Sequence, residues 1–244
     1  MYKMLHSLIF FNDINFLFND LSLNKTYAYN INITFRWGIL MKKLIGLFAL
    51  IAFLSSSCFA IDEALYKKYK EVSDNPNIIE AIELLENTSA KYSKDAILGK
   101  NLTAKPIKVE FKNLAEISPM YMNFDALGWK VKKRLNIYIN IKHQDAPIEA
   151  LAALLSHEAI HQDEYNSINE ETYAWTLEAA VWTQLTEDTP NLEEISHPLV
   201  ERENVIKKLF VRGDYSSKYI HSFVISNKGY KNLPERSYGF EELL

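Results

Sequence analysis

Cysteine is almost absent from this chain, because Cys58 is the only one among its 244 residues. A single cysteine cannot form an internal disulfide, and a metal site elsewhere in the chain must use histidine and carboxylate ligands. Cys58 also falls inside an N-terminal segment with the pattern of a signal peptide. The mature protein is therefore expected to contain no cysteine.

Long apolar runs and positive charge are also scarce. The apolar run at residues 44–54 has 11 residues, whereas a helix needs about 20 to cross a bilayer. Downstream of residue 60 the chain has 22 basic and 29 acidic residues, a net charge of about −7. This acidity argues against nucleic acid as a partner, and the short run argues against a stable membrane span after signal cleavage.

Residues 41–60 have the three parts of a secretory signal peptide. Met41-Lys42-Lys43 is a basic start, residues 44–54 are the apolar core, and small residues lead to a cleavage point after Ala60. We therefore expect an exported protein, periplasmic or secreted. A lipoprotein signal at Cys58 is the weaker alternative, because Ser55 stands where such signals carry an aliphatic residue.

Residues 1–40 do not fit in front of a signal peptide. They are rich in Asn, Phe and Ile and show no sustained periodicity. We interpret them as an over-extended reading frame, with Met41 as the native start. The alternative is a genuine extension that turns the apolar run into a membrane anchor.

The string His157-Glu158-Ala159-Ile160-His161 is the most informative motif. On a helix, residues four apart share a face, so both imidazoles can reach one metal ion. Glu158, rotated by about 100° around the axis, can touch a metal-bound water without being a ligand. This is the H-E-x-x-H pattern of zinc hydrolases, with two ligands and a general base. The alternative is two surface histidines beside a solvated glutamate.

The surrounding sequence predicts a small sheet packed on the motif helix. Asp145-Ala146-Pro147 is a helix-start signal, and apolar residues at helical spacing follow it. Residues 135–141 alternate in a way that predicts a strand with one buried face. Residues 105–111 predict another short strand, and Gly128-Trp129 predicts a turn.

The third metal ligand is expected from the next helix, because a catalytic zinc usually takes three protein ligands. Ser167 and Glu170 fit a capping box, in which Glu170 reaches back to the capping serine. This would occupy Glu170 and leave Glu171 as the favoured ligand, with Glu170 as the alternative. Glu178 lies seven residues beyond Glu171 and could orient a histidine. The competing interpretation is a solvated face of glutamates.

The motif followed by a helix bearing Glu171-x-x-Ala174 resembles the gluzincin metallopeptidases. The resemblance covers roughly residues 105–185 and is specific only at the motif. It implies a zincin core, peptide hydrolysis and zinc held by His157, His161 and a glutamate of the next helix, here Glu171. The chain departs from the family in its short link between the two helices and in lacking a recognisable substrate-binding motif. The metzincin pattern is disfavoured, because Glu164 and Ser167 occupy its later Gly and His positions.

Five other residues invite a functional interpretation. His143 could stabilise an oxyanion, and His197 could be a replacement ligand, but an ordinary packed or surface role is favoured for these and for His221. Tyr165 and Tyr173 could donate a hydrogen bond to a tetrahedral intermediate. Packing between helices is at least as good an explanation for both tyrosines.

The sequence thus predicts an α+β fold with a zincin-like core at residues 101–190 and helical segments at 61–100 and 191–244. The predicted function is an exported zinc metallopeptidase. Its zinc (Zn2+) would be held by His157, His161 and Glu171, with Glu158 as the base. The substrate could be a protein, a short peptide or a peptidoglycan cross-link. The alternatives are a non-catalytic zinc-binding envelope protein with the same fold and a membrane-anchored interaction protein with a chance motif.

Overall fold

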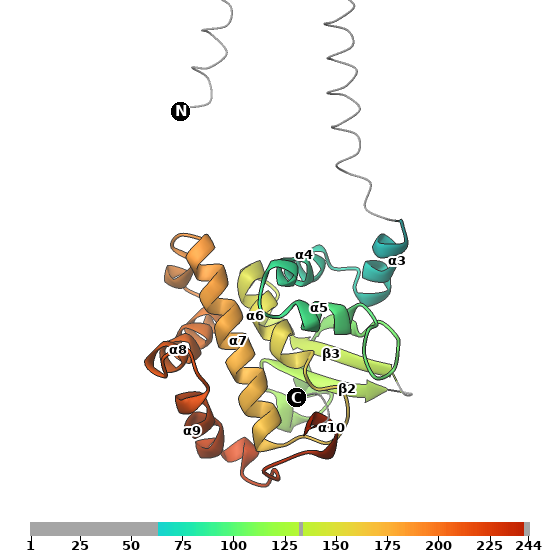
Figure 1. Ribbon diagram of the computed structural model, residues 1–244. Helices are drawn as coiled ribbons and strands as arrows, with labels where there is room; N and C mark the ends of the chain where they lie inside the picture. Colours follow the sequence, from blue (N-terminus) through green and yellow to red (C-terminus); the bar gives the residue numbers. More distant parts are fainter. Residues whose placement is uncertain (1–62, 132–133, 242–244) are drawn as a thin grey trace, which may run out of the picture. The chain divides into compact units, whose positions relative to one another are not determined.

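The computed structural model describes residues 63–131 and 134–241 (Figure 1). The signal peptide expected at 41–60 and the extension expected at 1–40 lie outside the described residues. The described part belongs to one unit of the chain, and its class is α+β, with helices packed against a single three-stranded mixed sheet. Across these ranges, no helix combines the length and the apolar character needed to span a membrane.

The sheet has the strand order β1–β3–β2, so β3 is central and β2 is an edge strand. The central strand β3 (Arg134–Asn140) runs parallel to β1 (Lys108–Lys112) and antiparallel to β2 (Ala126–Val131). The turn predicted at Gly128-Trp129 is wrong, because both residues pair with β3 within β2. Pairing with a neighbouring strand has overridden the local turn signal of glycine.

Strand β3 is buried on both faces rather than on one. Leu135, Ile137 and Ile139 join the main apolar core on one face. On the other face, Asn140 Nδ2 donates hydrogen bonds to the carbonyl oxygens of Met122, at 3.1 Å, and Phe124, at 2.8 Å. The segment between β1 and β2 therefore covers the polar face of β3, which the alternation of residues alone could not reveal.

Helix α6 (Ile148–Glu158) is the centre of the apolar core. Leu151, Leu154 and Leu155 are buried in the same cluster as the core-facing residues of β3. Each fully buried leucine contributes about 1.5–3 kcal/mol relative to an exposed one. The predicted packing of a small sheet on the motif helix is thereby present, and it fixes the end of α6 beside the edge strand β2.

The other helices surround α6 and its neighbour. Helix α7 (Ile168–Asp188) packs along α6, α4 packs on α6, and α8 and α9 pack on α7 (Figure 1). Helix α4 begins at Pro76, because the Asn75 side chain caps it and Pro76 occupies its first turn. The remaining helical bounds are α3 (Glu63–Val72), α4 (Pro76–Leu84), α5 (Lys91–Ile97), α8 (Pro198–Arg212), α9 (Lys218–Ser226) and α10 (Tyr238–Glu241).

Candidate metal centre

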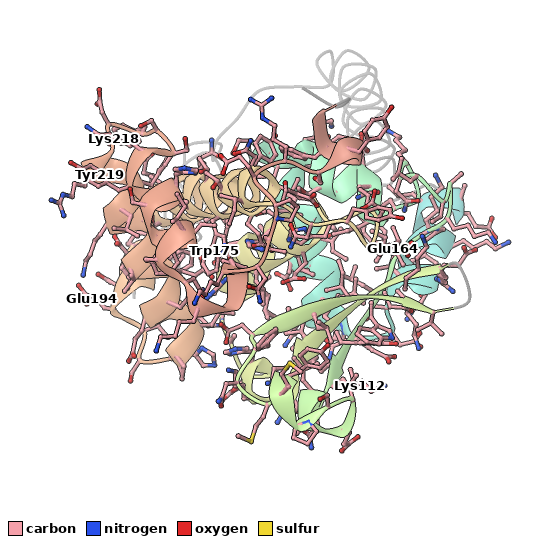
Figure 2. All side chains as sticks on the ribbon, turned by 90° about the horizontal axis from the view of Figure 1, so that it is seen from below. Lys112, Glu164, Trp175, Glu194, Lys218 and Tyr219 are labelled. Carbon is pink, nitrogen blue, oxygen red and sulfur yellow. The ribbon has the colours of Figure 1, made fainter. Side chains whose placement is uncertain are left out.

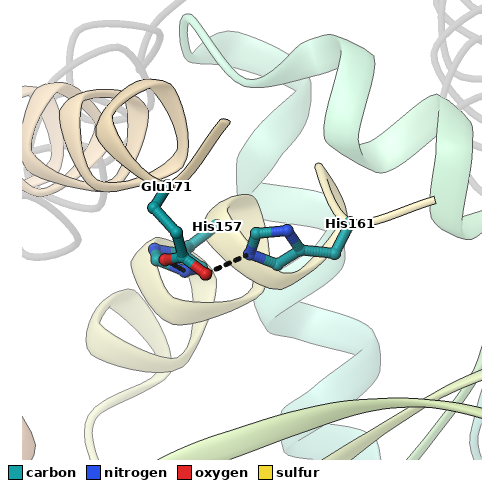
Figure 3. A group of neighbouring side chains, drawn as sticks. All are labelled: His157, His161 and Glu171. Atoms are coloured by element: carbon teal, nitrogen blue, oxygen red, sulfur yellow. Dashed lines mark ion pairs between the residues drawn. The ribbon is translucent and has the colours of Figure 1, made fainter. Parts of the chain in front are cut away.

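Helices α6 and α7 bring His157, His161 and Glu171 together (Figure 3). One potential ligand atom of each residue lies within 4.8 Å of the other two. His157 Nε2 is 3.7 Å from Glu171 Oε2, and His161 Nε2 is 3.7 Å from Glu171 Oε1. His157 and Glu171 are buried, and His161 is half-buried. This group can in principle bind a metal ion.

The hydrogen bonding of Glu171 fits a ligand. Its Oε1 accepts a hydrogen bond from Asn166 Nδ2, whereas its buried Oε2 has no hydrogen-bond partner within the described part of the chain. A buried carboxylate oxygen without a donor is costly unless a cation compensates it. Two imidazole nitrogens and a carboxylate oxygen are donors that first-row divalent metals accept.

The motif predicted that both histidines lie on one helix, but only His157 does. Helix α6 ends at Glu158, and the chain turns tightly, so that Ile160 N donates a hydrogen bond to His157 O at 2.9 Å. Such a three-residue hydrogen bond tightens the ends of many helices. The turn still leaves the rings of His157 and His161 with centroids 5.2 Å apart. The expected proximity is present, although His161 reaches it from beyond the helix.

The far side of His157 faces a buried ionic network. Its Nδ1 lies 2.9 Å from Oε2 of Glu178, which is fully buried. The Arg202 guanidinium donates to both oxygens of Glu178, at 2.6 and 3.1 Å. An imidazole whose Nδ1 faces a carboxylate directs its Nε2 lone pair towards the opposite side. Glu178 therefore has the position predicted for orienting a histidine.

His161 is supported by a different set of groups. Its Nδ1 lies 2.9 Å from Glu170 Oε1, and Glu170 Oε2 accepts a hydrogen bond from Ser237 Oγ at 2.9 Å. Ser167 caps α7 as predicted, with Oγ accepting from Glu170 N at 3.1 Å. The other half of the predicted capping box is wrong, because the Glu170 side chain points to His161 and Ser237 instead of back to Ser167.

Glu158 lines a cleft of about 340 Å³. Residues 128–130 of the edge strand β2 also line it, as do Asp163 and Glu164, the second of which is labelled in Figure 2. Gly128 lies next to the Glu158 carboxylate, because a Cβ on this glycine would stand 3.9 Å from Glu158 Oε2. Of the three clustered residues, His161 also lines the cleft. A ligand in the cleft can therefore contact both Glu158 and His161.

Burial and neighbouring charges shift the pKa values of the motif residues. Burial raises the pKa of Glu158, against the opposing effect of His157 and His161. Burial lowers the pKa of His161, but the hydrogen bond with Glu170 and the negative charges around it outweigh burial and raise the pKa to about 9. A metal ion binding here would displace a proton from His161, since only neutral imidazole is a ligand.

The other histidines considered from the sequence lie outside the cluster. His143 is buried with Nε2 2.7 Å from Asp125 Oδ1, and it does not line the cleft. His197 caps α8, accepting a hydrogen bond from Leu199 N at 3.1 Å. His221 Nδ1 lies 3.1 Å from Thr172 Oγ1. The structural interpretation favoured for these histidines agrees with their contacts.

Neither candidate tyrosine from the sequence points to the cluster, but a third tyrosine lies beside it. Tyr165 is 65% exposed, and Tyr173 packs against Phe240 with ring centroids 5.5 Å apart. Tyr230 was missed: burial and the nearby negative charge of Glu171 raise its pKa well above the ordinary value. Its hydroxyl accepts a hydrogen bond from Trp175 Nε1 at 3.1 Å. No local motif marks Tyr230, because it follows α9 and approaches the site only in the folded chain.

Comparisons with protein-family models, with curated proteins and with solved structures gave no match to this chain.

Proposed function

We propose that the protein is an exported zinc-dependent hydrolase of peptide bonds with a zincin-like core. The observation that carries the proposal is the placement of Glu158 in an open cleft beside the buried group of His157, His161 and Glu171. Those three residues would hold the metal and leave a position free for water or substrate, as in catalytic zinc sites. Zinc bound there would supply a Lewis acid that polarises the scissile carbonyl and acidifies water.

Glu158 is suited to take and return a proton. It is adjacent to His157 in the chain, lines the cleft and is not among the three clustered residues. A raised pKa brings a carboxylate closer to the working pH of a general base. Glu158 would accept the proton of the attacking water and later deliver it to the leaving amine.

The edge of the sheet suits an extended substrate. Strand β2 pairs only with β3 in the described sheet, and residues 128–130 line the cleft. A peptide can add to such an edge through backbone hydrogen bonds, which hold it in an extended form. The same edge would accept an extended stem peptide of peptidoglycan, so the proposed substrate class is a peptide without further specification.

Metal analysis and substitution of the base test the proposal together. The purified protein is expected to retain one zinc per chain after dialysis, and less than about 0.2 equivalents, unchanged by added zinc, would contradict it. Glu158→Gln is expected to keep the metal but to lose at least ~10²-fold in cleavage of a peptide library. Equal cleavage by both proteins would exclude Glu158 as the base. Zinc binding without any cleavage would favour the non-catalytic alternative.

A further inference from the structure

Arg202 connects the metal centre to the strand that borders the cleft. From α8 its guanidinium donates to both oxygens of Glu178, which faces His157. Its Nε also lies 3.3 Å from Asp125 Oδ2, and Asp125 is the residue immediately before β2. Arg202 therefore contacts both the carboxylate that faces His157 and the carboxylate that immediately precedes β2.

Aromatic packing restricts the position of this guanidinium. Arg202 Cζ lies 4.4 Å from the ring centroid of Trp175. The same indole meets the His157 imidazole edge to face, with centroids 5.1 Å apart. Trp175 lies in the interior among the helices (Figure 2) and is only 8% exposed. Arg202 and His157 are thus held by one rigid side chain as well as by Glu178.

Three carboxyl groups surround the Arg202 guanidinium: those of Glu178, Asp125 and Glu203. Glu203 Oε1 also accepts from Arg202, at 2.6 Å, but burial and the nearby Glu178 raise the pKa of Glu203 well above its ordinary value. The pKa of Glu178 is lowered despite its burial, mainly by the Arg202 charge. The pKa of Asp125 is also lowered despite burial, by the hydrogen bond with His143 and by the Arg202 charge.

We propose that Arg202 is a positioning residue, which fixes Glu178 and with it the metal-binding orientation of His157, and which ties this support to the start of the cleft strand through Asp125. The inference rests on the proposed metal site. Planar, bidentate pairing is a property of guanidinium that lysine cannot reproduce. The geometry of the pair, as well as its charge, should therefore matter.

The test compares three substitutions in the whole protein: Arg202→Met, Arg202→Lys and Arg212→Met. Arg212 is a matched control, because it lies on the same helix over the ring of Tyr219, at 4.6 Å, about 15 Å further along the axis. Zinc affinity is measured by chelator competition, and the geometry of the site by the visible spectrum of bound cobalt(II). Hydrogen exchange of residues 126–131 reports on the cleft strand.

Arg202→Met is expected to weaken zinc binding by about 10–100-fold, the usual effect of losing an outer partner of a metal ligand. Its cobalt spectrum should change and exchange in β2 should rise, while Arg212→Met matches the wild type in all three measurements. Arg202→Lys should recover only part of the affinity and can be measured even where Arg202→Met fails to fold.

Two results would overturn the inference. If Arg202→Met or Arg202→Lys bound zinc within twofold of the wild type with an unchanged cobalt spectrum, Arg202 would have no positioning role and the proposed metal site would stand. If the wild type bound neither zinc nor cobalt, the proposed function would fail together with the inference.

Discussion

The two histidines of the motif are supported in opposite ways. His157 sits on the last turn of α6 and faces a buried ionic group formed by Glu178 and Arg202. His161 lies beyond the helix and is held through Glu170 by a serine hydroxyl from the C-terminal segment. The first support is an arginine that pairs with the fully buried Glu178, whereas the second is a single carboxylate that is held in turn by a serine hydroxyl. Two residues of identical chemistry should therefore respond differently when their partners are removed.

The largest effect is expected from Glu178→Ala. This change removes the bidentate partner of Arg202, whose side chain is 18% exposed, and leaves Asp125 and Glu203 as its carboxylate contacts. Breaking a buried pair costs up to about 3–5 kcal/mol. Equilibrium unfolding of the metal-free protein in urea should show the loss, and zinc affinity should fall as well. A loss of less than about 1 kcal/mol would place this group among weak, solvent-screened pairs and remove the contrast with His161.

A smaller effect is expected from Glu170→Ala. It removes the partner of His161 Nδ1 and leaves Ser237 with Ser167 Oγ as its remaining acceptor, which together should cost about 1–3 kcal/mol. Zinc affinity should fall less than in Glu171→Ala, because Glu170 contacts a candidate ligand and Glu171 is itself one. Chelator competition on the two variants measures this order. The reverse order would make Glu170 the third ligand.

The free energy of unfolding at acid pH should report on the ionic group around Arg202, to which Asp125 belongs. Burial tends to raise the pKa of Asp125, but the hydrogen bond from His143 and the charges of Arg202 and Lys142 lower it well below the ordinary value. A lowered pKa in the folded state means that stability is present above about pH 4 and is lost as the pH falls through the folded pKa. Asp125→Asn should thus unfold with a flatter dependence on pH below 4 than the wild type, measured by urea titrations at fixed pH. Parallel curves would contradict this assignment.

The smallest effect is expected from Ser237→Ala. Only one hydrogen bond to Glu170 and one to Ser167 are lost, a change of about 0.5–1.5 kcal/mol, and zinc affinity should change by less than about 3-fold. Ser226→Ala, an exposed serine on α9, is the control and should leave thermal unfolding unchanged. A loss for Ser237→Ala as large as that for Glu178→Ala would show that the two supports do not differ in kind.

Local patterns predicted the elements that carry the site. Helical spacing and the Ser167 cap were enough to place α6 and α7. They also placed the polar residues His157, His161, Glu171 and Glu178 on or next to these helices. They could not predict that α6 ends at Glu158 or that β2 is an edge strand, because both depend on packing against other elements. Arg202, Tyr230 and Ser237 reach the site from segments far along the chain, and their contacts have no local signature in the sequence.

The distance in sequence between the motif and its supports has a consequence for synthesis. Ser237 meets Glu170 across 67 residues, and Arg202 meets Glu178 across 24. During translation the two histidines emerge before Glu171, and Arg202 and Ser237 emerge later still. An early metal ion would meet ligands that are still free to rotate, so tight metal uptake should be a late event that follows completion of the C-terminal helices.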